Sequence, residues 1–170
     1  DVVIGGFYQI LVVLGVHSVI VLPALMDVMA GTPSPNYASL GVVSFAVLGV
    51  TLGILCKTKS KKLKELALPA AVSALFGVTE PATYAIVMPR MKYLVVTCVS
   101  RAIACGVGGL FGFAVYTIPG FGIFKIPGYI DPANPVQSLI VASGVMLLAT
   151  ALGFIITYVM FNDAQYGDDK

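Results

Sequence analysis

The short turn from Gly77 to Pro81 (GVTEP) holds the acidic residue best placed to do chemistry in this chain. The turn interrupts an apolar stretch, so Glu80 lies at a depth where a carboxylate is costly and where such a group marks a substrate or ion pathway. It can accept hydrogen bonds from paired hydroxyls, as on a sugar, or it can carry a proton or bind a cation. Alternatively, it caps its own helix or pairs with Arg101.

The same turn predicts the end of one helix and the start of another. Gly77 suits the position after a helix end, where the backbone takes a positive φ. Thr79 or Glu80 can cap the next helix, and Pro81 fits its first turn because no N–H is needed there. The turn therefore places Glu80 where free backbone N–H groups also gather.

His17 is the only histidine of the chain, and it falls in the middle of another apolar run. A neutral imidazole can hydrogen-bond a sugar hydroxyl at physiological pH, although a lone histidine in an apolar helix is often only packed there. Gln9 precedes it by about two helical turns and shares its face. Polar groups on one face of a membrane helix suggest a lined cavity.

Other polar residues favour structural roles. Arg101 is expected to reach the membrane interface or to make a structural pair rather than to contact substrate. Four glycines between Gly106 and Gly112 are expected to allow close helix packing. The three cysteines have no metal-ligand or disulfide spacing, and we expect no metal site and no cofactor.

Composition determines the class of protein. Of the 170 residues, 58% are hydrophobic and only 11% are charged, which excludes disorder and argues against a soluble domain. Basic residues outside one lysine cluster are scattered, so nucleic-acid binding is not expected. The composition predicts an all-α polytopic membrane protein.

Four runs are long enough to cross a bilayer, which takes about 20 apolar residues. They are about Phe7 to Ala30, Ala38 to Cys56, Tyr93 to Ile118 and Val136 to Phe161. Between the second and third, two shorter apolar arms, 66–76 and 82–89, meet at the Glu80 turn. Each arm covers about half a membrane, so we expect about four transmembrane helices plus a re-entrant helical hairpin.

Lysines predict the orientation. Five of them fall between Lys57 and Lys64, which places that loop in the cytoplasm. A re-entrant hairpin returns to the same side, where Arg90 and Lys92 follow. The segment from Pro119 to Pro135 then lies outside, and the polar tail, residues 162–170, is cytoplasmic.

These residues resemble a known family. GFYQILVVLGVH at Gly6 to His17 and FGVTEPATYAIVMP at Phe76 to Pro89 are similar to the bacterial phosphotransferase system membrane domain, enzyme IIC, in its β-glucoside, sucrose and trehalose branch. The resemblance covers residues 1–161 and corresponds to the C-terminal part of such a domain. It leaves 162–170 as a cytoplasmic tail or linker.

The resemblance implies a mechanism. Enzyme IIC binds external sugar near the membrane midplane and carries it across by an elevator-like movement, and the enzyme IIB domain then phosphorylates the sugar. The family roles fall on Glu80 and His17 as sugar contacts, with Thr79 and the backbone of Gly77 and Val78 shaping the pocket.

The resemblance also implies partners and a location. The chain is expected in the bacterial cytoplasmic membrane, as a homodimer in contact with lipid. Enzyme IIB and IIA domains, in the same or separate chains, supply the phosphoryl group, because these residues contain no phosphoryl carrier. The activity implied is that of the membrane subunit of a phosphoenolpyruvate-dependent sugar phosphotransferase.

Two other functions fit the same residues. An ion-coupled secondary transporter would use Glu80 as a proton or cation site, because half-helices at the midplane serve that purpose too. A membrane sensor or scaffold would not transport at all. Transport by a phosphotransferase permease depends on phosphoenolpyruvate, whereas transport by an ion-coupled transporter depends on an ion gradient. This difference separates the two functions.

Overall fold

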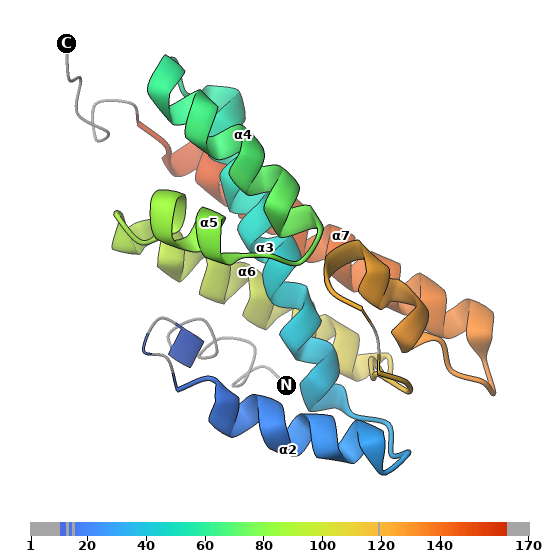
Figure 1. Ribbon diagram of the computed structural model, residues 1–170. Helices are drawn as coiled ribbons and strands as arrows, with labels where there is room; N and C mark the ends of the chain where they lie inside the picture. Colours follow the sequence, from blue (N-terminus) through green and yellow to red (C-terminus); the bar gives the residue numbers. More distant parts are fainter. Residues whose placement is uncertain (1–10, 13, 15, 119, 163–170) are drawn as a thin grey trace.

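Helix α3 (Pro35–Lys57) is the central element of the protein (Figure 1). A computed structural model describes residues 11, 12, 14, 16–118 and 120–162. The Ser34 hydroxyl caps α3 by accepting a hydrogen bond from the Tyr37 N–H at 3.3 Å, and Pro35 occupies its first turn. The helix is apolar on every face and is mostly buried, as expected of a helix surrounded by others.

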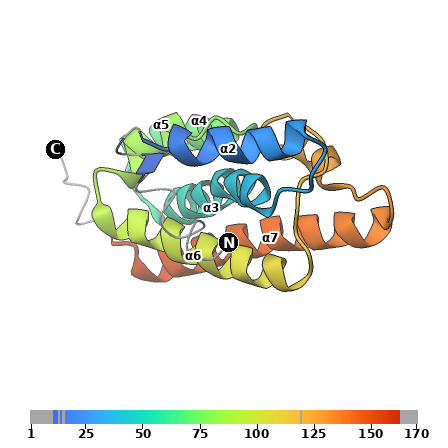
Figure 2. The ribbon, with the colours of Figure 1, turned by 90° about the horizontal axis from the view of Figure 1, so that it is seen from below.

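Two layers enclose α3. Figure 2 shows α2 (Ser18–Met29), α4 (Lys61–Leu75) and α5 (Glu80–Ala82) on one side, and α6 (Met91–Leu110) and α7 (Pro135–Met160) on the other. Among the described residues, three helices are long and apolar enough to cross a membrane: α3, α6 and α7. The architecture is therefore that of a helical membrane protein.

The contact between α3 and α7 depends on glycine. A Cβ atom added to Gly153 would lie 2.8 Å from the carbonyl oxygen of Ala46, and one added to Gly53 would lie 2.9 Å from that of Phe154. The Thr150 hydroxyl crosses the same contact and donates to the Phe45 carbonyl at 3.2 Å. Small residues let the two backbones approach, which is how apolar helices associate in lipid.

Helix α6 is shorter than the predicted third span, which was expected to continue to Ile118. It ends at Leu110 because Gly112 adopts a φ of +74° and the Phe113 N–H bonds back to the Gly108 carbonyl at 3.0 Å. The chain beyond is extended and pairs with the residue that caps α3: the N–H of Ser34 bonds to the carbonyl of Val115 at 3.0 Å.

The hairpin consists of α4, the turn at 76–79, α5 and a π-helical turn, η1 (Thr83–Val87). Both of its flanks lie near the C-terminal end of α7. Nζ of Lys57, before the hairpin, donates to the Tyr158 carbonyl at 2.6 Å, and Nζ of Lys92, after it, donates to the Met160 carbonyl at 3.3 Å. The chain thus enters and leaves the hairpin at the same end of the bundle.

The first predicted span is represented by α2, whose 12 residues rise only about 18 Å. Residues 7–10, 13 and 15 of that span lie outside the described residues. Asp27, near the end of α2, is exposed.

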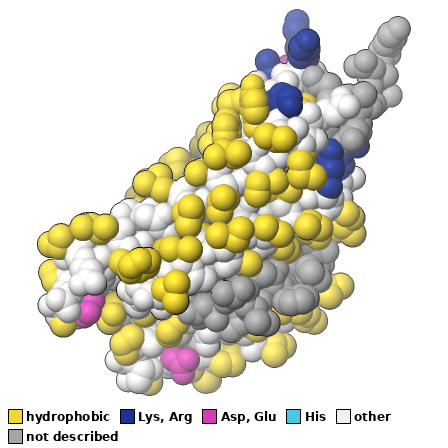
Figure 3. Space-filling model, turned by 180° about the vertical axis from the view of Figure 1, so that it is seen from behind, with side chains coloured by type: hydrophobic (Ala, Val, Ile, Leu, Met, Phe, Trp, Pro, Cys, Tyr) yellow, Lys and Arg dark blue, Asp and Glu magenta, His cyan; other side chains and the backbone are white. Residues whose placement is uncertain are grey.

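Large apolar side chains remain exposed on the outer helices. On α7 they are Val136, Ile140, Leu147, Ile155 and Val159. Figure 3 shows one face of the molecule covered with hydrophobic side chains, with Lys and Arg gathered at one end. Apolar surface of this extent marks a membrane-facing protein.

Candidate functional site

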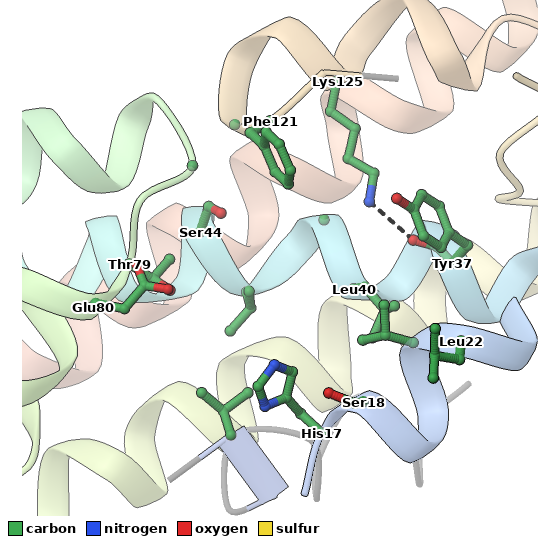
Figure 4. A pocket seen from close by; sticks show the side chains of 16 residues that line it. His17, Ser18, Leu22, Tyr37, Leu40, Ser44, Thr79, Glu80, Phe121 and Lys125 are labelled. Carbon is green, nitrogen blue, oxygen red and sulfur yellow. Dashed lines mark hydrogen bonds between the residues drawn. The ribbon is translucent and has the colours of Figure 1, made fainter. Parts of the chain in front are cut away.

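A cavity of about 380 Å³ lies between the start of α2, one face of α3, the hairpin turn and a 3-10 helix, η2 (Gly122–Tyr129). Its volume is within the range of small-molecule sites, about 300–1,000 Å³. Figure 4 shows the labelled side chains that surround it. The lining residues are Val12, His17, Ser18, Val21, Leu22, Tyr37, Leu40, Gly41, Val43, Ser44, Gly77, Thr79, Glu80, Phe121, Gly122 and Lys125.

The hairpin turn forms one end of the cavity. Gly77 has a φ of +94°, and the N–H groups of Gly77 and Val78 bond back to the carbonyls of Ala74 and Ser73, each at 3.0 Å. This is the predicted helix end, and the prediction for Gly77 is confirmed. A side chain at Gly77 would also collide with the backbone nitrogen of Gly122 in η2.

Thr79 occupies the N-cap position of α5, and Glu80 is the first residue of that helix. The Thr79 side chain makes no capping hydrogen bond. Both residues line the cavity, and the Glu80 side chain is exposed. Glu80 therefore offers a carboxylate to whatever occupies the space.

His17, the residue just before α2, lines the same cavity. The structure thus brings together four of the predicted site residues, Gly77, Thr79, Glu80 and His17. Val78 does not line the cavity, and its side chain is 51% exposed. Gln9 lies outside the described residues.

Lys125 is the functional candidate that the sequence reasoning missed. It lies in η2, lines the cavity and is only 7% exposed. Its Nζ donates to the Tyr37 carbonyl at 3.1 Å and lies 4.2 Å from the centre of the Tyr37 ring. One signal was available: Lys125 is the only charged residue between Arg101 and Asp131.

Local packing fixes the position of Lys125. Gly41 has no side chain, and a Cβ atom there would lie 2.7 Å from Cδ of Lys125, so the lysine stem occupies space that glycine leaves. Burial, together with the nearby charge of Arg101, lowers the pKa of Lys125 to about 7. The amine can donate hydrogen bonds in either protonation state.

Arg101 has a structural position and does not line the cavity. It is fully buried, and its Nε and Nη2 donate to the Ser39 carbonyl at 3.2 and 2.8 Å. The three cysteines are also separate from the cavity. No group of three His, Cys, Asp or Glu side chains that could hold a metal ion occurs in the described parts of the chain.

The arrangement suits a polyhydroxylated ligand without net charge. Glu80 supplies a carboxylate that accepts hydrogen bonds, Lys125 supplies an amine that donates them, and the His17 imidazole can accept or donate. Serine and threonine hydroxyls and apolar side chains complete the wall. Few polar groups in a mainly apolar cavity are typical of small-molecule sites, where they fix the ligand's orientation.

Known proteins with similar sequences are components of one transport system. The chain is 34% identical over 131 residues to the β-glucoside-specific EIIBCA component of the phosphotransferase system from Halalkalibacterium halodurans, covering 77% of this chain and 21% of that protein. It is 30% identical over 161 residues to the arbutin-, cellobiose-, and salicin-specific EIIBC component from Escherichia coli, covering 93% and 33%. The trehalose-specific EIIBC component from Escherichia coli is 28% identical over 120 residues, covering 68% and 25%.

The chain thus spans between a fifth and a third of the length of these relatives. No solved structure matches it significantly. The model of the family "Phosphotransferase system, EIIC" matches residues 2–102, which is more than half of the chain. Together with the apolar helices, this match shows that the chain is a bacterial membrane protein and belongs to the phosphotransferase system EIIC family.

Proposed function

We propose that this chain forms the sugar-binding part of a phosphotransferase permease, which translocates a β-glucoside or disaccharide across the cytoplasmic membrane. The observation that carries the proposal is the cavity that unites His17 with Thr79 and Glu80. These residues come from segments about sixty positions apart in the sequence, and they meet in one space of ligand size. The carboxylate of Glu80 accepts hydrogen bonds from sugar hydroxyls, and His17 orients the ring.

The proposal includes the phosphorylation step, which belongs to other domains. The named relatives combine this kind of domain with EIIB, or with EIIB and EIIA, in one chain. We assign the transfer of the phosphoryl group to such domains, on the same or separate chains, and the holding of the acceptor sugar to this one. The complete assembly is then a phosphoenolpyruvate-dependent sugar phosphotransferase.

The end of the bundle with Lys57 and Lys92 is proposed to face the cytoplasm. Lysine-rich loops remain on that side, and both flanks of the hairpin meet the C-terminal end of α7 there. Residues 162–170 are then a cytoplasmic tail or linker, and residues 1–161 belong to the membrane domain. The hairpin is proposed to be re-entrant, with the first predicted span as a fourth crossing, and the assembly to be a homodimer.

The test uses the full-length protein in membranes with phosphoenolpyruvate, the general phosphotransferase proteins and radiolabelled cellobiose, salicin, sucrose and trehalose. Glu80→Gln keeps the shape of the side chain and removes its charge. The matched control is Glu65→Gln, because Glu65 is exposed on α4 and does not line the cavity. We expect the wild type and the control to form sugar phosphate and Glu80→Gln to lose this activity at equal membrane level.

Full activity of Glu80→Gln would assign Glu80 a structural role and contradict the site. Uptake that follows an ion gradient without phosphoenolpyruvate would instead support the ion-coupled transporter. The relatives named above are all phosphotransferase components, so this alternative has no support among them. A protein that neither phosphorylates nor takes up sugar would fit the sensor or scaffold.

A further inference from the structure

The cavity is elongated along α3. Tyr37 and Ser44, which both line it, are seven residues apart on that helix, which corresponds to about 10 Å. Figure 4 shows Thr79 and Glu80 beside Ser44 at one end and Lys125 beside Tyr37 at the other. A single pyranose ring bound at Glu80 does not extend over this length, so space remains at the Lys125 end.

That end has its own recognition chemistry. Lys125 is more than nine-tenths buried, and the Tyr37 carbonyl is its one hydrogen-bond acceptor among the described residues. A lysine amine has further protons to donate. Leu22 and Leu40 line the neighbouring wall and supply apolar contact. A hydroxylated ring with an apolar face fits both features.

We propose that Lys125, held by Tyr37, is a specificity residue that binds the second unit of a two-unit glycoside. The inference rests on the proposed function: the first ring occupies the end with Glu80, Thr79 and His17, and Lys125 donates a hydrogen bond to a hydroxyl of the second unit. The substrate class is therefore a disaccharide or another glycoside with a hydroxyl-bearing second unit, rather than a monosaccharide.

The experiment measures equilibrium binding of two ligands to the full-length protein. Cellobiose has a second ring with hydroxyls, whereas methyl β-glucoside carries only a methyl group in that place. Lys125→Met keeps much of the stem that packs over Gly41 and removes the amine. We expect the dissociation constant for cellobiose to rise by about tenfold, the usual effect of losing one such hydrogen bond, and that for methyl β-glucoside to stay within about twofold.

Lys57→Met is the matched control. Nζ of Lys57 also donates to a backbone carbonyl, that of Tyr158 at 2.6 Å, and also lies over a tyrosine ring, 5.1 Å from its centre. Lys57 does not line the cavity. Its substitution removes the same kinds of contact away from the ligand, so both dissociation constants should remain at their wild-type values.

A purely structural role for Lys125 predicts a different result. Lys125→Met would then raise the dissociation constants of both ligands equally or change neither. Either outcome overturns the proposal. If Lys125→Met does not accumulate in the membrane, Tyr37→Leu serves in its place, since it removes the ring below the amine and keeps the backbone carbonyl. It should show the same selective loss for cellobiose, and an equal loss for both ligands would overturn the proposal.

Glu80→Gln separates this proposal from the proposed function. Suppose that Glu80→Gln abolishes binding of both ligands and Lys125→Met affects cellobiose and methyl β-glucoside equally. Then only the proposed site for the second unit is contradicted. If Glu80→Gln binds both ligands as the wild type does, the sugar site itself is wrong. If the wild-type protein binds neither ligand, both the proposed function and the second-unit site are overturned for β-glucosides.

Discussion

The Arg101 guanidinium donates from Nε and Nη2 to the carbonyl oxygen of Ser39, at 3.2 and 2.8 Å. The two preceding carbonyls of α3 are used in the same way. The Tyr129 hydroxyl donates to Ala38 at 3.0 Å, and Nζ of Lys125 donates to Tyr37 at 3.1 Å. Three successive carbonyls near the start of α3 thus accept hydrogen bonds from α6 and η2, which fixes the wall of the cavity.

Arg101→Met should destabilise the protein without abolishing sugar binding by the folded fraction. The substitution removes charged donors from a buried carbonyl, at a cost of about 1.5–3 kcal/mol, while Arg101 does not line the cavity. The measurement is the melting temperature in detergent alongside sugar affinity. Lys61→Met, at an exposed position on α4, is the control and should leave both unchanged. Lost affinity at an unchanged melting temperature would contradict the structural role.

Gly77→Ala should abolish sugar binding, because alanine is strained at a φ of +94° and its Cβ would collide with Gly122. Gly31→Ala separates these causes. Gly31 has a φ of +76°, but a Cβ there meets nothing within 4 Å, so only the backbone strain of about 1–2 kcal/mol applies. We expect both variants to melt at a lower temperature than the wild type. Only Gly77→Ala should lose binding of radiolabelled sugar. Equal binding by the two variants would argue against the tight turn as part of the site.

His17→Ala should weaken sugar binding by about tenfold, the loss expected for one hydrogen bond, with little effect on folding. Asp27→Asn is the control on the same segment, since Asp27 is exposed at the far end of α2 and does not line the cavity. Binding is measured by equilibrium dialysis with labelled cellobiose. Wild-type affinity in His17→Ala would show that the histidine only packs beside the site.

Gly153→Leu should prevent stable packing of α7 on α3, because even a Cβ at this position lies 2.8 Å from the Ala46 carbonyl oxygen. Gly144→Leu lies on the same helix, where a Cβ meets nothing within 4 Å, and should be tolerated. The amount of folded protein after detergent extraction, followed by size-exclusion chromatography, distinguishes the two. Equal yields would mean that the α3–α7 contact does not limit stability.

Helix type and helix ends were predictable where local chemistry decides them. The apolar runs predicted α3 and α7 to within three residues at each end, and Gly77 predicted the end of α4. The end of α6 was missed because Phe111 to Ile118 is as apolar as the helix before it. Only the backbone at Gly112 and the pairing of Val115 with Ser34 turn the chain there.

Two ionisable residues of the site were predictable from the sequence, and a third, Lys125, was not. Glu80 and His17 are conspicuous in apolar sequence, and both line the cavity. Lys125 was passed over because its segment is rich in glycine and proline and was predicted to be an outer loop. Its burial depends on Gly41 and Tyr37, about 85 residues earlier, and no local pattern encodes such a tertiary contact.

The direct backbone contact between Gly77 and Gly122 restricts how the protein can move. With no side chain between the two backbones, any displacement of the hairpin turn that preserves this contact carries η2 with it. While that contact holds, the turn and η2 move together as two neighbouring walls of the cavity. The hinges of such a motion would have to lie outside the turn and η2.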